Sequence, residues 1–189
     1  MKNFFIITGG PGAGKTTLLN ALEADGYKTI PEAARSIIRE ELEKNGDALP
    51  WKNKQFYTDK MIAVSILDYN RARANQTNEI CFFDRGILDA VCYADMINYK
   101  LSAEVIKKVV NCSYNTKVFI LPPWKEVYQT DNERKQDWKE AKHTYLEMKS
   151  TYKRFGYEVI NVPIGNIHER KEFVLTQIRQ RNGKLFRKY

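Results

Sequence analysis

Eight residues near the N-terminus have the types and the spacing that can hold a polyphosphate. The run from Gly9 to Thr16 reads Gly-Gly-Pro-Gly-Ala-Gly-Lys-Thr and satisfies the pattern G-x-x-x-x-G-K-[ST]. Average residue usage gives a chance match in about 0.6% of chains of this length. In this pattern backbone N–H groups wrap a di- or triphosphate, and glycines are needed because a Cβ would block the approach or forbid the backbone angles. The run therefore predicts a nucleoside triphosphate site.

The two side chains that end this run have predicted roles of their own. Lys15 can reach the β- and γ-phosphates, and the Thr16 hydroxyl can ligate Mg²⁺. An apolar run, residues 3–8, precedes the pattern and a leucine-bearing segment, residues 16–25, follows it, as a strand and a helix should. The residues expected to contact the nucleotide, ATP or GTP, are Gly9, Gly10, Pro11, Gly12, Ala13, Gly14, Lys15, Thr16 and Thr17.

Two carboxylates follow predicted strands further along the chain. Asp84 ends the apolar run 79–84, where it can hold Mg²⁺ or its waters, and Glu32 follows the short strand candidate 27–30. Because ligands of α/β sheets collect beyond the carboxyl ends of the strands, both side chains should face one crevice. A structural role is the alternative for each carboxylate: a salt-bridged strand end for Asp84, and a helix-dipole contact for Glu32.

Further blocks of sequence point to one family. Besides the glycine-rich run they are Pro31–Arg35, Phe83–Gly86, Leu121–Trp124 with Tyr128–Arg134, and Gly156–Pro163. With these blocks the chain resembles P-loop NTPases of the nucleoside and nucleotide kinase group. More narrowly, it resembles the AAA-labelled ATPase-like family related to the ribosylnicotinamide kinase domain and to a GTP- and phosphoinositide-binding protein. The resemblance spans most of the chain.

The resemblance implies roles for residues outside the glycine-rich run. It makes Asp84 a carboxylate on the metal side and Arg85 a stabiliser of charge on the phosphates. Gly86 is then expected to let the chain turn sharply and keep Arg85 near the ligand. Glu32 is implied to be the general base or to orient the acceptor hydroxyl, with Arg35 one turn later on the same side.

The segment from about 124 to 138 is charged and lies between a predicted strand and a predicted long helix. Phosphotransferases of this shape place a mobile lid here, which supplies a cation to the transferring phosphoryl group and excludes water. Arg134 is the candidate cation, with Lys135 behind it. A solvated loop that opens the helix is the alternative.

The spacing of apolar residues predicts the elements that position these side chains. Strands alternate with helices, which favours a mostly parallel sheet covered on both faces. We expect a single domain over residues 1–189 with the three-layer α/β/α P-loop NTPase fold, a mostly parallel five-stranded sheet and a lid segment. The expected strands are 3–8, 27–30, 79–84, 117–121 and 157–162, and the expected helices after 16–25 are 32–44, 53–75, 87–99, 103–111, 133–155 and 169–180.

Composition limits the partners and the compartment. The net charge is +8, and residues 168–189 carry +5 of it, so the chain is not uniformly basic as a nucleic-acid surface would be. An anionic small molecule plus a solvated basic tail explains the balance, and the tail at about 183–189 could make weak contact with a membrane surface. No apolar run approaches the roughly 20 residues that cross a bilayer. With three scattered cysteines, we expect a cytoplasmic protein without a disulfide framework.

Two functions follow from these observations. The first is a phosphotransferase that moves the γ-phosphate of ATP to a small hydroxylated acceptor, nucleoside- or nucleotide-like. The second is a nucleotide-dependent switch that binds a protein or a phosphoinositide.

Trp51, Phe56 and Tyr57 are expected to pack under a loop, with an aromatic acceptor pocket as the alternative. The acceptor, the ATP or GTP preference and the oligomeric state stay open.

Overall fold

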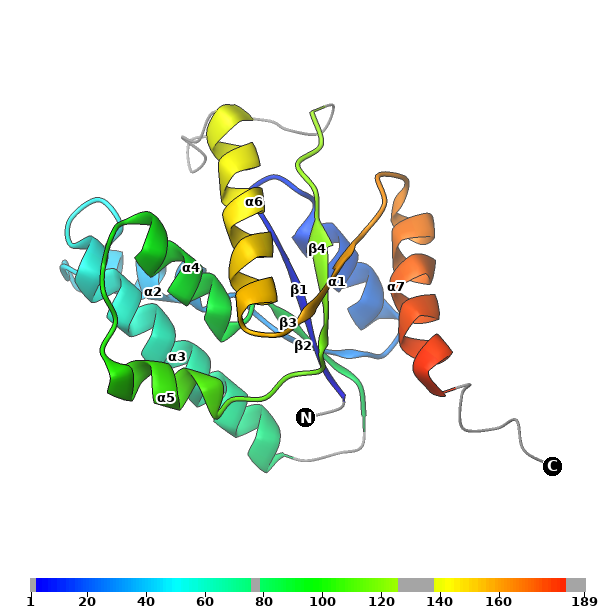
Figure 1. Cartoon of the computed structure of the whole chain (residues 1–189), viewed down its shortest axis with the longest axis horizontal. Coiled ribbons are helices and arrows are strands. Elements are labelled where there is room, and N and C mark those ends of the chain that lie inside the picture. Colours follow the sequence, from blue (N-terminus) through cyan, green and yellow to red (C-terminus); the bar gives the residue numbers. More distant parts are fainter. Residues whose placement is uncertain (1–2, 76–78, 126–137, 183–189) are drawn as a thin grey trace.

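Five parallel strands form the centre of the molecule in a computed structural model that describes residues 3–75, 79–125 and 138–182 (Figure 1). The strands lie in the order β2-β3-β1-β4-β5, and every neighbouring pair is parallel. This arrangement confirms the predicted fold class. The strands are β1 (Phe4–Gly9), β2 (Lys28–Ile30), β3 (Cys81–Asp84), β4 (Lys117–Leu121) and β5 (Glu158–Asn161).

The helices lie close to their predicted ranges. Of the predicted helix 133–155, residues 133–137 lie outside the described part of the chain. The helix predicted over 87–99 ends early, because Asn98 adopts a left-handed φ of 55° and Tyr99 N donates to Ala94 O at 2.8 Å. The helices are α1 (Lys15–Ala24), α2 (Ala33–Glu43), α3 (Lys54–Ala74), α4 (Ile87–Met96), α5 (Ala103–Val110), α6 (Trp138–Arg154) and α7 (Ile167–Asn182).

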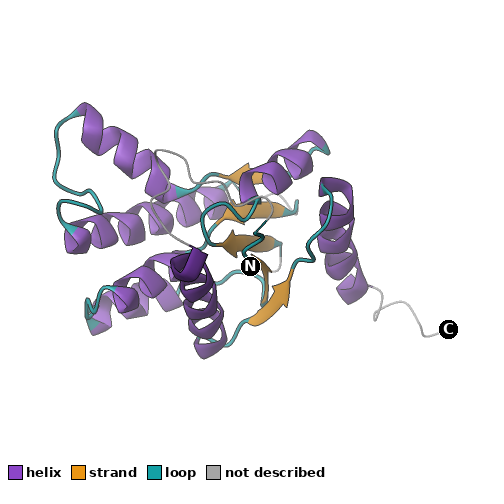
Figure 2. Cartoon of the chain, turned by 90° about the horizontal axis from the view of Figure 1, so that it is seen from above, coloured by secondary structure: helices purple, strands orange, loops and turns teal. Residues whose placement is uncertain are grey.

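Helices cover both faces of the sheet and give three layers. Alternate residues of β1 belong to two different cores, as the pleat of a strand requires: Phe4 and Ile6 on one face, Phe5 and Ile7 on the other. The second face is covered by α1 and α7, and the first by α2 to α6, as the two views show (Figures 1 and 2). Because both faces are buried, β1 reads as a continuous apolar run rather than an alternating one.

The strand register brings the predicted site residues to one edge of the sheet. Ile7 of β1 is paired with Asp84 at the end of β3, and Gly9 is paired with Leu121 at the end of β4. The glycine-rich loop therefore leaves the sheet directly beside the end of β3. Among the described residues, no helix combines the length and the apolar character needed to cross a membrane.

Candidate functional site

The glycine-rich loop between β1 and α1 needs glycine at three positions for different reasons. Gly12 and Gly14 have φ values of 73° and 79°, in the left-handed region that L side chains rarely adopt. Gly9 has no room for a side chain, because a Cβ there would lie 2.6 Å from the carbonyl oxygen of Leu121. The loop backbone thus lies against the end of β4 and turns in left-handed steps, which is the geometry of a concave anion cradle.

Lys15 is buried at the start of α1 and points back into the loop. Its Nζ donates to the carbonyl oxygens of Gly9 at 2.9 Å and Gly10 at 3.0 Å. Burial, and to a smaller extent the charge of Arg85, lowers the pKa of Lys15 to about 7. A bound polyphosphate would restore the full charge of this ammonium group, so the lysine is placed and poised for an anion.

Arg170 of α7 supports the glycine-rich loop by donating hydrogen bonds to its backbone, a role that the sequence analysis did not predict. Its Nη2 donates to the carbonyl oxygens of Ala13 at 3.1 Å and Gly14 at 3.5 Å, and the residue is only 6% exposed. A Cβ on Gly14 would lie 2.8 Å from Nη1 of this arginine. The expected solvated basic tail is therefore wrong for Arg170, because this cation is bonded to the phosphate loop. The neighbouring Lys171 is paired with Asp25 at 2.6 Å.

Asp84 lies at the end of β3, where a metal-side carboxylate is expected. Its Oδ1 is buried and has no hydrogen-bond partner among the described residues. Burial raises the pKa of Asp84, and the charge of Lys15 opposes that shift. An orphaned carboxylate oxygen beside a phosphate cradle fits a Mg²⁺ ion or its waters, because magnesium takes few protein ligands and keeps several waters. Thr16, exposed in the first turn of α1, offers a hydroxyl as a second ligand.

Arg85 is held between two carboxylates at the wall of the crevice. Its Nε donates to Glu32 Oε1 at 2.7 Å and its Nη1 to Asp89 Oδ1 at 3.2 Å. Burial alone would raise the pKa of Glu32, but the charges of Arg85 and Lys15 outweigh it and the pKa falls below its ordinary value. Glu32 is therefore an ionised hydrogen-bond acceptor. Arg35 also contacts Glu32, with Nε 3.3 Å from Oε2, but its side chain is mostly exposed.

The sharp turn after β3 occurs at Arg85 and not at Gly86, which corrects the sequence-based expectation. Arg85 has a φ of 70°, which is uncommon for a residue with a Cβ and costs on the order of 1 kcal/mol. Gly86 has an extended φ of −113°. It must be glycine for packing, because a Cβ would lie 2.5 Å from Ile6 Cδ1 and 2.8 Å from the Tyr152 hydroxyl.

Asp89, in the first turn of α4, organises a buried network that the sequence did not reveal. Its carboxylate accepts hydrogen bonds from the hydroxyls of Thr8 and Tyr152, from Gly86 N at 2.9 Å and from Arg85. These donors come from β1, α6, the turn after β3 and Arg85 itself. The only sequence signal was an aspartate one turn after the predicted strand end, a position that a helix-capping role explains equally well.

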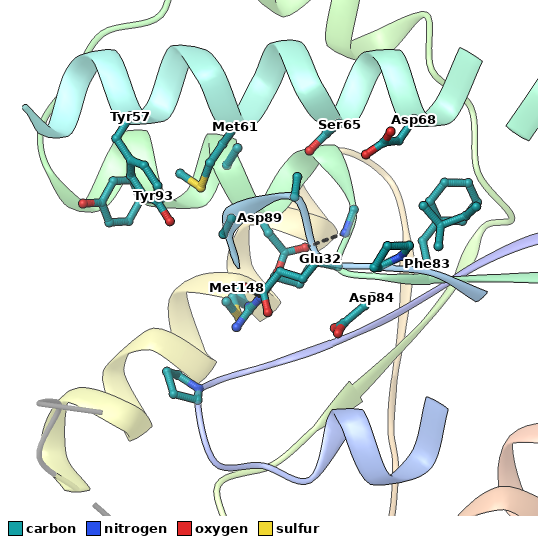
Figure 3. A pocket seen from close by; sticks show the side chains of 18 of the residues that line it. Glu32, Tyr57, Met61, Ser65, Asp68, Phe83, Asp84, Asp89, Tyr93 and Met148 are labelled. Carbon is teal, nitrogen blue, oxygen red and sulfur yellow. Dashed lines mark hydrogen bonds and ion pairs between the residues drawn. The ribbon is translucent and has the colours of Figure 1, made fainter. Parts of the chain in front are cut away.

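A cavity of about 330 Å³ opens beside the phosphate loop between β3, α3 and α4 (Figure 3). Tyr57 is buried and lines this cavity, which is the position that the acceptor-pocket alternative requires. Trp51 and Phe56 are 62% and 45% exposed and do not pack under a loop as expected. Other residues that line the cavity include Pro11, Glu32, Ser65, Asp68, Asp84, Arg85, Asp89, Tyr93, Thr144 and Met148.

Thr144 of α6 brings an unpartnered hydroxyl to the cavity. The residue is 6% exposed, and its Oγ1 has no hydrogen-bond partner among the described residues. A buried hydroxyl without a partner costs free energy unless a ligand or water completes it. Arg134 and Lys135, the predicted lid cations, lie outside the described residues, which resume at Trp138.

Comparisons with known proteins agree with this fold. A family model described as AAA domain matches residues 4–170, which is most of the chain. No curated protein matches the chain by sequence.

Several solved structures share the fold. A NadR protein solved with NR aligns with a TM-score of 0.72 at 19% identity, over 95% of this chain and 51% of that one. This chain therefore spans about half of that relative's length. Deoxyadenosine kinase from M. mycoides, with bound dATP, aligns at 0.58 and 15% identity over 93% and 98% of the two chains. Thymidylate kinase from Candida albicans aligns at 0.64 and 12% identity over 96% and 92%.

Proposed function

The chain belongs to the AAA domain family, and from that premise we propose that it is a phosphotransferase that uses ATP and Mg²⁺. It moves the γ-phosphate to a small hydroxylated acceptor, nucleoside- or nucleotide-like. One observation carries the proposal: a cavity of about 330 Å³ is lined both by Pro11 of the phosphate loop and by Asp84 at the end of β3. A switch protein needs the loop alone, whereas a kinase also needs a chamber for the acceptor beside the γ-phosphate.

In this proposal, different groups of the site bind the triphosphate and neutralise the charge of the phosphate that is transferred. Backbone N–H groups of residues 9–17, apart from Pro11, which has none, and Nζ of Lys15 bind the triphosphate. Arg85, held in place by Glu32 and Asp89, neutralises charge on the phosphate that is transferred. Because the transition state of this reaction is loose, positioning and charge neutralisation are the main demands on the protein.

Glu32 orients the acceptor hydroxyl in this proposal. Its lowered pKa keeps it ionised, so it can accept the hydrogen bond of an alcohol at neutral pH. When bound, Mg²⁺ held by Asp84 and Thr16 supplies neutralising charge at the phosphates. Arg134 is proposed to close over the phosphates from the lid, and GTP is the alternative donor.

The test is transfer of phosphate in a purified system. The protein is incubated with Mg²⁺-ATP and a library of nucleosides and small alcohols, and products are detected by mass spectrometry. We expect one class of acceptor to gain a phosphate, and Lys15→Ala to abolish both transfer and tight nucleotide binding. ATP hydrolysis with no phosphorylated acceptor, stimulated by a protein or a phosphoinositide, would contradict the proposal and favour the switch.

A further inference from the structure

The cavity beside the phosphate loop has an uneven balance of charge. Four carboxylates line it, Glu32, Asp68, Asp84 and Asp89, and among the described lining residues Arg85 is the one cation. That guanidinium is already paired with Glu32 and Asp89. Lys15 lies at the phosphate loop and not in the cavity wall. An anionic acceptor entering this chamber would therefore meet an excess of carboxylates over cations, and no free cation among the described residues of the wall.

The cavity wall has a second polar feature, formed by Ser65 and Asp68 on one face of α3. Both side chains project from α3 toward the end of β3 (Figure 3). The described ion-pair partner of Asp68 is Arg71 at 3.7 Å, whose own side chain is 69% exposed. Burial raises the pKa of Asp68, with Arg71 opposing the shift, so this carboxylate is already partly removed from water. An ionised carboxylate only accepts hydrogen bonds, and it therefore requires a donor or a cation.

The rest of the wall is suited to a flat ring. Tyr57 and Tyr93 lie edge to face at 5.7 Å, and Met61 follows Tyr57 one turn along α3 (Figure 3). Aromatic and thioether surfaces pack well against rings. The unpartnered, nearly buried Thr144 hydroxyl, which reaches the cavity from α6, indicates independently that this chamber is built for a polar ligand.

We infer that the acceptor is an uncharged or cationic alcohol with a ring that carries a hydrogen-bond donor, such as an amino group, and that Asp68 with Ser65 reads this donor. This inference rests on the proposed function and narrows it: phosphorylated and carboxylated acceptors are excluded. Like charges placed together in a desolvated site are strongly unfavourable, and a site that expects a donor discriminates against a ligand without one.

Binding experiments test the inference separately from catalysis. Calorimetry with the ADP–Mg²⁺ complex of the full chain compares adenosine and cytidine with inosine and uridine, with AMP and CMP, with shikimate and with choline. We expect the amino-bearing nucleosides to bind at least about tenfold more tightly than the oxo-bearing ones, and at least about a hundredfold more tightly than the monophosphates or shikimate. Asp68→Asn should reduce or reverse the preference for amino over oxo rings, because an amide can donate as well as accept.

Asp59→Asn is the matched control, since it makes the same change on an exposed residue of α3 outside the cavity lining. It should leave the preference unchanged. The inference is overturned if a monophosphate or shikimate binds within tenfold of the best neutral alcohol, if no neutral or cationic alcohol binds, or if Asp68→Asn keeps the wild-type preference. Tight binding of an amino-bearing nucleoside that ATP then fails to phosphorylate would instead count against the proposed function.

Discussion

Arg85 and Glu32 form an ion pair across the crevice, with Nε 2.7 Å from Oε1, although 53 residues of chain separate them. The pair ties the turn after β3 to the start of α2, and both side chains are largely buried. Removing one member of such a pair leaves an uncompensated buried charge, which costs far more than the loss of a surface ion pair. Glu32 therefore fixes Arg85, and in the proposed function it has a second role, which is to present an ionised oxygen to the acceptor.

The Glu32→Gln variant tests these two roles of Glu32 separately from nucleotide binding. We expect kcat for acceptor phosphorylation to fall about 100-fold, while the dissociation constant for ATP changes by less than about threefold. The free energy of unfolding should fall by about 1–3 kcal/mol, because Arg85 loses a charged partner. Glu40→Gln is the control, since it makes the same change on an exposed position of α2. A parallel loss of turnover and ATP affinity would show that Glu32 has only a structural role.

The lowered pKa of Lys15 leads us to expect that the protein takes up a proton when it binds a nucleotide. In the free protein the lysine has a pKa of about 7, lowered by burial, and a bound polyphosphate should raise that pKa again. At pH 8 most free molecules then carry a neutral Lys15, and binding must protonate it. ATP affinity should therefore fall as pH rises above about 7. Calorimetry at pH 8 in two buffers of different ionisation enthalpy should detect uptake approaching one proton.

Lys15→Arg is the control for this pH dependence, because a guanidinium stays charged throughout the range. We expect this variant to bind ATP without proton uptake at pH 8, whatever its affinity. Uptake by Lys15→Arg equal to that of the wild type would assign the proton to another group.

The sequence predicted the parts of the fold and site that depend on local pattern. Each strand and helix could be found because apolar spacing and glycine positions are local signals, and the order of strands brought Asp84 beside the glycine-rich loop. Tertiary partners left no such signal. Arg170 looked like one cation of a basic tail, and its contact with Ala13 O depends on how α7 packs against α1. Asp89 likewise gains its role only when β1 and α6 bring hydroxyls to it.

Arg170→Lys tests the support of the phosphate loop by α7. A lysine has no planar fork and cannot reproduce the contacts with the carbonyl oxygens of Ala13 and Gly14. We expect ATP affinity to fall about tenfold and the free energy of unfolding to fall by about 1–2 kcal/mol. Lys171→Gln is the matched control, because Lys171 joins the same two helices through Asp25 without touching the loop. If both variants weaken ATP binding equally, helix docking and not loop support is responsible.

Thr144→Val tests whether the orphaned hydroxyl of α6 serves a ligand. Removing a buried hydroxyl that has no partner relieves a desolvation penalty, so the free energy of unfolding should stay constant or rise by about 1 kcal/mol. Turnover with the acceptor should nevertheless fall, by about tenfold for one lost hydrogen bond. Thermal unfolding and steady-state kinetics measure the two effects. Thr151→Val, a buried change two turns along α6 and outside the cavity lining, should leave turnover unchanged.

Asp84→Asn should stabilise the free protein and weaken its response to magnesium. The wild-type carboxylate is buried with an unpartnered oxygen and its pKa is raised by burial, so the free energy of unfolding falls as pH rises from the unfolded pKa, near 3.9, to the higher folded pKa. An asparagine amide does not ionise, so above that pH range the variant should unfold at a higher temperature than the wild type. For Asp84→Asn, the increase in ATP affinity that Mg²⁺ gives relative to EDTA should be at least about tenfold smaller than for the wild type, because a neutral amide is a poor magnesium ligand. A variant that is less stable than the wild type, or that keeps the full magnesium response, would rule out Asp84 as the metal-side carboxylate.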